Sequence, residues 1–152
     1  MLRQTLKTAL SDSMRAKDKN AVATLRLILA ALKDREIAAR SKSDATEIGD
    51  GEIESMLQTM VKQRRESIEM YVKGDRQELA DKEAEEITVI ERFLPNQLSD
   101  GDVEKAVAAV VADLGAQSLK DMGRVMGTLR ERHAGQMDFG KAGSIAKKAL
   151  SQ

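Results

Sequence analysis

Cations and glycines gather in the stretch KDMGRVMGTLRERHAG, which covers residues 120–135. It contains the basic residues Lys120, Arg124, Arg130 and Arg132, and the glycines Gly123 and Gly127 four positions apart. Glycines beside cations are typical of phosphate loops, but those loops follow a β-strand, and no strand is indicated here. Ser118, with Asp121 three residues later, predicts the start of a helix. Both glycines therefore fall inside a helix.

Glycines inside a helix need an explanation, because each costs about 1 kcal/mol relative to alanine. At i and i+4 the two glycines share one face, where another backbone can approach closely. Two occupants remain open: another part of this chain, or the backbone of a nucleic acid. In the second case the expected phosphate contacts are Lys120, Arg124, Arg130, Arg132, Lys141, Lys147 and Lys148. Because the stretch has no Phe, Tyr or Trp, such a contact would read backbone and shape rather than bases.

Catalytic chemistry lacks its usual side chains. The chain has no cysteine and one histidine, His133, which excludes thiolate nucleophiles and cysteine-based metal sites. We expect His133 to be a surface residue near a helix C-terminus, where a cation is favoured. The carboxylates of EAEEITVIE, residues 83–91, lack the Glu-x-x-His motif of di-iron bundles, so a solvated or salt-bridged face is expected. The sequence thus predicts no catalytic residue, no metal and no cofactor.

A second charged cluster is MVKQRRESIEMY, residues 60–71. The interpretation that we favour makes Lys62 and Arg65 partners of glutamates four residues further along the same helix, at Glu66 and Glu69. The alternative is that both cations contact a phosphate backbone. The neighbouring glutamates already balance the basic charges, which favours the first interpretation.

Charge is balanced over the whole chain but uneven along it. The chain has 25 basic and 25 acidic residues. Residues 47–97 carry 7 basic and 13 acidic residues, whereas residues 114–152 carry 7 basic and 3 acidic residues. A polyanionic partner is therefore expected at a basic end of the chain rather than at its middle. No apolar run approaches the ~18 residues that a membrane span needs. The N-terminus also lacks the pattern of a secretory signal, so a cytoplasmic protein is expected, with no membrane partner.

The elements that must position these residues are helices, since aromatic residues make up only 2% of the chain and alanine, leucine and methionine favour helices. Apolar periodicity and capping residues predict seven of them. In the first lobe they cover about 2–17, about 20–39 after a cap at Asp18 or Asn20, 50–73, and 76–94 after a cap at Asp75. Gly74 is expected to end the third of these helices in a left-handed conformation. In the second lobe they cover 100–114 after Ser99, 119–135 after Ser118, and a last helix that begins at 139 after Asp138. Residues 40–51 are expected to form a mobile loop.

Two helical lobes follow from this pattern, at residues 1–95 and 96–152, divided after Pro95. The first holds four helices, including a long antiparallel hairpin of the third and fourth, and the second holds three short helices. Arg64 lies on the inner stripe of the third helix, opposite position 85 or so. Because a desolvated arginine needs a partner, we expect Arg64 to pair with Glu86.

Four segments of the chain resemble the characteristic blocks of the YqeY family. They are LRLILAALKDREIAAR (25–40), KQRRESIEMYVKGDRQELADKEAEEI (62–87), LPNQLSD (94–100) and GAQSLKDMGRVMGTL (115–129). Residues 123–150 are also similar to the tail domain of GatB, the B subunit of the tRNA-dependent amidotransferase. The resemblance implies an all-helical fold of two lobes and a link to tRNA-dependent amidation.

Three functions are compatible with this resemblance. The first is a non-catalytic binding module that docks tRNA or a tRNA-handling enzyme through the C-terminal lobe. The second is an activity of the carbon–nitrogen ligase or amidase type, with glutamine as amido donor, within a larger complex. The third is a protein–protein adaptor that uses the acidic hairpin. In GatB the catalytic sites lie outside the tail, which favours the first.

Overall fold

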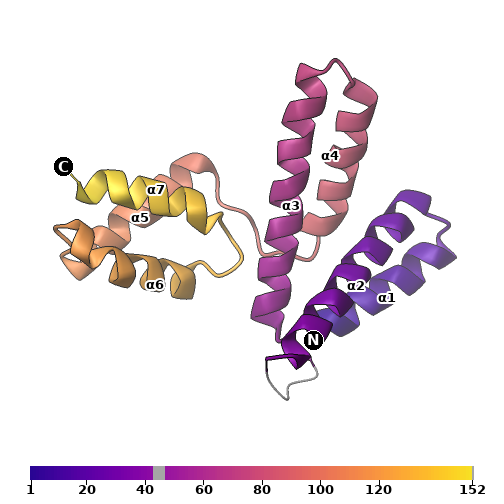
Figure 1. Cartoon of the computed structure of the whole chain (residues 1–152), viewed down its shortest axis with the longest axis horizontal. Coiled ribbons are helices and arrows are strands. Elements are labelled where there is room, and N and C mark those ends of the chain that lie inside the picture. Colours follow the sequence, from indigo (N-terminus) through magenta and orange to yellow (C-terminus); the bar gives the residue numbers. More distant parts are fainter. Residues whose placement is uncertain (43–46, 152) are drawn as a thin grey trace. The chain divides into compact units, whose positions relative to one another are not determined.

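The computed structural model describes residues 1–42 and 47–151, and every regular element in these residues is helical (Figure 1). The all-α fold expected from the sequence is confirmed. The elements are α1 (Leu2–Arg15), α2 (Lys19–Arg40), α3 (Asp50–Lys73), α4 (Gln77–Glu91), α5 (Asp100–Leu114), a 3₁₀ turn η1 (Leu119–Asp121), α6 (Met122–Arg132) and α7 (Phe139–Leu150). Residues 43–46 of the loop expected at 40–51 lie outside the described residues.

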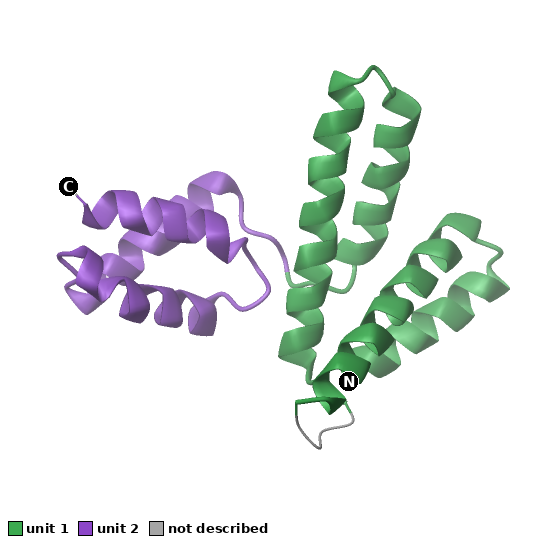
Figure 2. Ribbon diagram, in the orientation of Figure 1, with its two compact units in different colours: residues 1–95 green, residues 96–152 purple. Residues whose placement is uncertain are grey.

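The chain divides into two compact units, Met1–Pro95 and Asn96–Gln152 (Figure 2). The N-terminal unit consists of the helix pairs α1–α2 and α3–α4. Its core takes side chains from α1, α2, the first half of α3 and the last turns of α4; Leu6, Leu25, Ile28, Ile53, Leu57 and Ile90 are at most 1% exposed. Such burial stabilises the unit by about 1.5–3 kcal/mol for each large aliphatic side chain.

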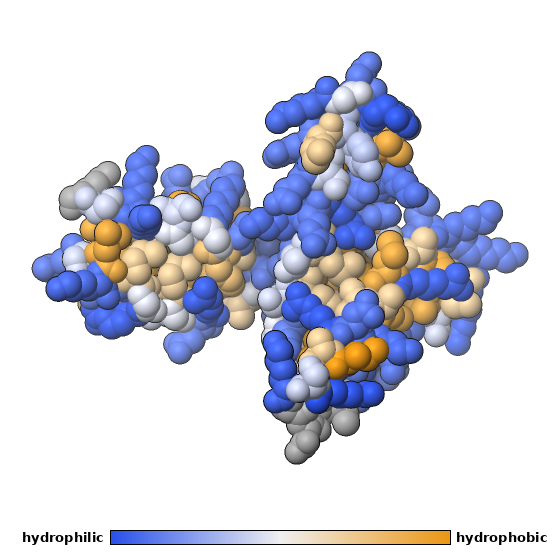
Figure 3. All heavy atoms as spheres, viewed as in Figure 1, coloured by the Kyte–Doolittle hydropathy of each residue, from blue (hydrophilic) through white to orange (hydrophobic). Residues whose placement is uncertain are grey.

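The outer part of the α3–α4 hairpin is built differently from this core. Between residues 62 and 86, Ala80 is the one buried side chain. Met70 and Val72 near the turn are 74% and 53% exposed, and hydrophilic residues cover most of this part in the view of Figure 3. The outer hairpin therefore depends on contacts between its own two helices.

The turn of this hairpin differs from the sequence prediction. Gly74 has φ −87° rather than a left-handed conformation, and Asp75 takes φ 57° instead. The Arg76 amide then donates to the Tyr71 carbonyl and the Asp75 amide to that of Val72, which is the Schellman pattern with Asp75 in the left-handed position. Asp75 is therefore not the cap of α4. The N-cap residue of α4 is Arg76, whose side chain makes no capping hydrogen bond.

Two other helices of the N-terminal unit end earlier than expected. α1 stops at Arg15 because Lys17 has φ 57° and the Asp18 amide donates back to Ser13, another Schellman end. α4 stops at Glu91, and residues 92–94 continue as turns with i to i−3 hydrogen bonds. Of the two cap candidates, Asp18 and Asn20, Asp18 caps α2 by accepting from the Ala21 amide over 3.1 Å.

The C-terminal unit is a three-helix bundle of α5, α6 and α7. Its core consists of residues at helical spacing: Val103, Val107, Val110, Val125, Met126, Leu129, Met137, Ala142, Ala146 and Leu150. Two apolar side chains of this unit lie outside the core, since Leu119 is 48% exposed and Ala149 is exposed. On α7 the buried stripe runs through Ala142 and Ala146 to Leu150.

Local signals set the helix ends of this unit. The Ser99 side chain accepts from the Asp102 amide, and Gly115 has φ 60° after α5. Ser118 and Asp121 form a capping box, and Asp138 accepts from the first amides of α7. The sixth helix was expected to run to Gly135, but α6 ends at Arg132.

Candidate nucleic-acid interface

The helices α6 and α7 lie side by side and run in opposite directions (Figure 1). Two contacts fix their register. Met126 lies against Gly143, with its Cε 3.7 Å from where a Cβ would stand on that glycine, and the Arg130 guanidinium lies 5.7 Å from the centre of the Phe139 ring. In each pair, the residue on α6 and the residue on α7 lie the same number of positions from the middle of the connection between the helices. The start of α6 is therefore level with the end of α7.

This register brings one group of predicted residues to one end of the bundle. Lys120 lies in the η1 turn just before α6, Arg124 lies in the first turn of α6, and Lys147 and Lys148 lie in the last turn of α7. All four are exposed. We call this group, together with Gly123 and Gly127, the α6–α7 basic end.

The two glycines face outward. A Cβ placed on Gly123 or Gly127 meets no atom within 4 Å, in contrast to Gly143, where it meets Met126. Among the described residues of the C-terminal unit, then, no atom fills the face that the two glycines share. The close contact between α6 and α7 is made through Gly143 rather than through Gly123 or Gly127.

The cations of the basic end differ in their partners. The structure pairs none of Lys120, Lys147 and Lys148 with a carboxylate among the described residues. Arg124 is held by Asp121, with an Nη2–Oδ1 distance of 2.9 Å and the arginine side chain 58% exposed. Three lysines are thus available for an anion, and Arg124 can exchange one partner for another at the surface.

Asp121 organises the start of α6. Its carboxylate accepts from the amide of Gln117 over 2.9 Å, from Arg124, and from the amide of Ser118 over 3.4 Å. The hydrogen bond from the Gln117 amide, the Arg124 guanidinium and the bond from Ser118 together lower the pKa of the Asp121 carboxyl below its usual value. Asp121 was read only as a capping residue from the sequence. Its i, i+3 spacing from Arg124 is the signal for the ion pair.

The other three predicted cations lie outside the basic end, and each has a partner. Arg130 lies over Phe139, a cation–π contact worth about 0.5–1 kcal/mol at an exposed site. Arg132 pairs with Asp113 and Lys141 with Asp100, each over 2.7 Å. No sequence signal marked these pairs, since their partners lie 19 and 41 residues away. The structure therefore divides the seven predicted residues into two groups.

The hairpin holds the remaining predicted residues. The Arg64 Nε donates to Glu86 over 2.8 Å, and its Nη1 donates to the Met60 carbonyl over 3.1 Å. Arg65 pairs with Glu91 across the hairpin over 3.0 Å, rather than with Glu69 on its own helix. Lys62 is exposed on the same helix. With these arginines engaged by carboxylates, the hairpin is a poorer anion site than the basic end.

The described residues contain no cluster of three or more histidine or carboxylate side chains suited to a metal ion. His133 follows α6 and its Nδ1 lies 3.1 Å from the Gln136 Oε1. In the part of the chain that the structure describes, no helix has both the length and the apolar character to span a bilayer.

The comparisons with known proteins point to one family. The profile of the family described as Yqey-like protein matches residues 3–150. An uncharacterized protein of Schizosaccharomyces pombe is 30% identical over 99 residues, which cover 65% of this chain and 76% of that protein. A Kluyveromyces lactis protein named "Altered inheritance of mitochondria protein 41, mitochondrial" is 31% identical over 112 residues, which cover 72% of this chain and 58% of the relative.

A protein of the same name from Candida glabrata is 34% identical over 90 residues, or 59% of this chain and 48% of that protein. This chain thus spans about half of these mitochondrial relatives, and a cytoplasmic location stays a prediction. The family resemblance drawn from the sequence is confirmed, and the chain belongs to the Yqey-like protein family.

Proposed function

We propose that the C-terminal unit is a non-catalytic module that binds the phosphate backbone of tRNA at the α6–α7 basic end. One observation carries this proposal: the outward face of Gly123 and Gly127 is open, and its Gly123 end lies level with Lys147 and Lys148, which have no carboxylate partner among the described residues. A face without side chains lets a sugar–phosphate backbone approach closely. The flanking cations would then neutralise its phosphates.

The choice of tRNA among nucleic acids comes from the similarity of residues 123–150 to the GatB tail. Without aromatic side chains at the basic end, bases would not be stacked, and recognition would rest on backbone position and shape. Asp121 opposes this binding by occupying Arg124. We infer that a phosphate takes over Arg124 when tRNA is bound.

A titration of labelled tRNA at several salt concentrations tests the proposal. The logarithm of the association constant should fall linearly with the logarithm of the salt concentration, because each neutralised phosphate releases counterions. Binding that is absent at low salt, or that does not change with salt, would contradict it.

A second candidate function is protein docking through the α3–α4 hairpin. The observation that favours it is the exposure of Met70 and Val72 at the outer end of the hairpin, within the acidic middle of the chain. A tRNA-handling enzyme such as the amidotransferase is the partner to test. With the purified enzyme on a sensor surface, Met70→Asp with Val72→Asp should abolish binding, whereas Lys148→Glu should leave it unchanged.

A further inference from the structure

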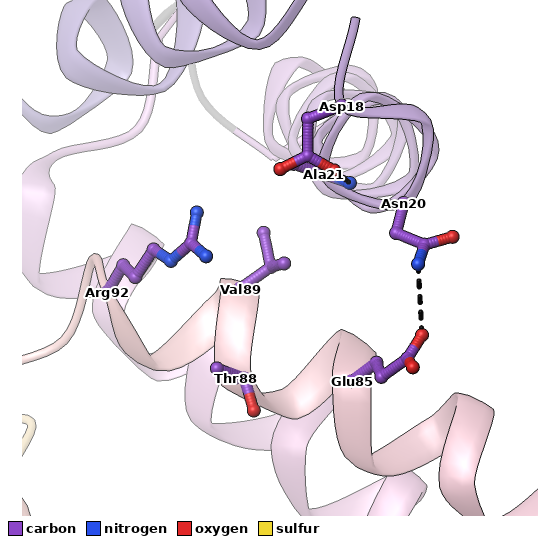
Figure 4. A pocket seen from close by; sticks show the side chains of 7 residues that line it. All are labelled: Asp18, Asn20, Ala21, Glu85, Thr88, Val89 and Arg92. Carbon is purple, nitrogen blue, oxygen red and sulfur yellow. Dashed lines mark hydrogen bonds between the residues drawn. The ribbon is translucent and has the colours of Figure 1, made fainter. Parts of the chain in front are cut away.

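A pocket of about 230 Å³ lies between the start of α2 and the last two turns of α4, inside the N-terminal unit (Figure 4). Its lining residues are Asp18, Asn20, Ala21, Glu85, Thr88, Val89 and Arg92. Neither the tRNA proposal nor the core uses the polar members of this set. The volume is below that of most drug-sized sites, about 300–1,000 Å³, which restricts an occupant to a small molecule.

The pocket has charges of opposite sign and an apolar floor. Ala21 and Val89 are 1% and 5% exposed and lie at its base. Glu85, Val89 and Arg92 follow one another along the same side of α4, so a carboxylate and a guanidinium lie two helical turns apart. Asp18 adds a second carboxylate from the opposite wall. A zwitterion can place each of its two charges beside a pocket group of opposite sign, which a purely anionic or purely cationic molecule cannot do.

Each of the two exposed carboxylates accepts one hydrogen bond within the protein. Asp18 Oδ1 accepts from the Ala21 amide over 3.1 Å, and Glu85 Oε2 accepts from Asn20 Nδ2 over 3.0 Å. Among the described residues, the second oxygen of each carboxylate accepts no hydrogen bond, and the Arg92 guanidinium has no carboxylate partner. The pocket thus presents two hydrogen-bonded carboxylates and one cation, each with hydrogen-bonding capacity to spare.

We propose that this pocket binds a small zwitterion of the α-amino-acid class. The geometry points to a carboxylate on Arg92, which can take it in a two-bond, planar contact, and an ammonium group on Asp18. The side chain of the amino acid lies across Val89 and Ala21 towards Asn20 and Glu85, so a side chain that ends in a hydrogen-bond donor is favoured. This site is separate from the basic end and its existence does not depend on tRNA binding.

The test is an NMR titration of the full-length ¹⁵N-labelled protein with L-alanine and L-lysine. Acetate and methylammonium serve as the two half-ligands. We expect amide shifts at residues 19–21 and 88–92 with both amino acids, at lower concentration for L-lysine, and no saturable shifts there with either half-ligand. No shifts there with either amino acid at tens of millimolar, or saturation by acetate alone, would overturn the proposal.

Three variants distinguish the contribution of the pocket charges to binding from an effect on folding. Arg92→Gln and Asp18→Asn should each weaken amino-acid binding by about tenfold or more, since each removes a charged hydrogen-bond partner. Asn is as good a helix cap as Asp, so Asp18→Asn should keep the helix content seen by circular dichroism. Arg26→Gln, on the exposed side of α2 away from the pocket, is the matched control and should change nothing. Equal binding by all variants would overturn the proposal.

Discussion

Arg64 on α3 and Glu86 on α4 lie equally far from the hairpin turn and form an ion pair over 2.8 Å, with only 14% and 17% of their side chains exposed. Glu83 Oε2 also lies 4.0 Å from the Arg64 Nε. In the outer hairpin, where few side chains are buried, this pair is a specific contact between the two helices. Together with the Arg65–Glu91 pair it helps to align α3 with α4.

Loss of one partner of this pair should destabilise the N-terminal unit. Glu86→Ala leaves the Arg64 guanidinium partly desolvated, and Arg64→Ala does the same to Glu86, so each should lower the free energy of unfolding by about 2 kcal/mol. The double variant Arg64→Met with Glu86→Leu should restore most of that loss. Tyr71, the one tyrosine of a chain without tryptophan, lies on the same hairpin and gives a fluorescence signal for urea titrations. Additive losses on combining Arg64→Ala with Glu86→Ala would show that the two residues do not interact.

Gly123→Ala and Gly127→Ala should have opposite effects on the stability of α6 and on the affinity for tRNA. Each added Cβ meets open space, so each substitution should stabilise α6 by about 1 kcal/mol through helix propensity. If a nucleic-acid backbone approaches this face, the same substitutions should weaken tRNA binding. Hydrogen exchange at the Val125 and Leu129 amides measures the first effect, and a tRNA titration measures the second.

Gly115→Ala is the control for these glycine variants. Gly115 has φ 60°, a conformation that costs a residue with a Cβ about 1–2 kcal/mol, so this variant should destabilise the unit and leave tRNA affinity unchanged at temperatures where it is folded. Unchanged tRNA affinity in Gly123→Ala and Gly127→Ala would remove the glycine face from the interface.

Charge reversal at the end of α7 should flatten the salt dependence of tRNA binding. Lys147→Glu with Lys148→Glu removes two expected phosphate contacts, and the slope of log affinity against log salt should become shallower by about 1 for each lysine. A fluorescence anisotropy titration between low and physiological salt gives both slopes. Lys148→Glu alone should have about half the effect, and the matched change Lys105→Glu on α5 should leave the slope as it is.

The start of α6 should lose stability in acid. The folded-state pKa of Asp121 lies below its usual value, and therefore below that of the unfolded chain, about 3.9. Its stabilisation is thus complete above that unfolded value and is lost as pH falls through the lowered folded pKa. Thermal unfolding should show a loss of stability below about pH 4 that is smaller in Asp121→Asn than in the natural protein. An identical acid dependence in both proteins would show that Asp121 contributes nothing to it.

Much of the fold follows from local sequence. The bounds of α3, the caps at Asp18, Ser99 and Ser118, and the glycine end at Gly115 depend on a few adjacent residues. The hairpin turn was misassigned because Gly74 and Asp75 can both take a left-handed conformation. Only the hydrogen bond from Arg76 to Tyr71 decides between them.

The candidate sites depend more on tertiary contacts. Which of the seven cations lie together follows from the α6–α7 register, and that register is set by contacts at Gly143 and Phe139. Arg65 was assigned to Glu69 because helical spacing shows only partners on the same helix, whereas its partner Glu91 lies across the hairpin. The pocket is lined by both Asp18 and Arg92, which are 74 positions apart in the chain. No periodicity in the sequence indicates that these two residues lie near each other.

The sparse burial of the outer α3–α4 hairpin has a consequence for how this fold can vary. A stretch whose side chains are mostly exposed can change length with little effect on the core, provided both helices lose or gain the same number of residues. Removing two helical turns, about seven residues, from each side of the turn keeps the two helices facing each other. The length of the α3–α4 hairpin is therefore adjustable in this fold. Insertions or deletions among relatives should come in matched pairs on either side of residues 74–76.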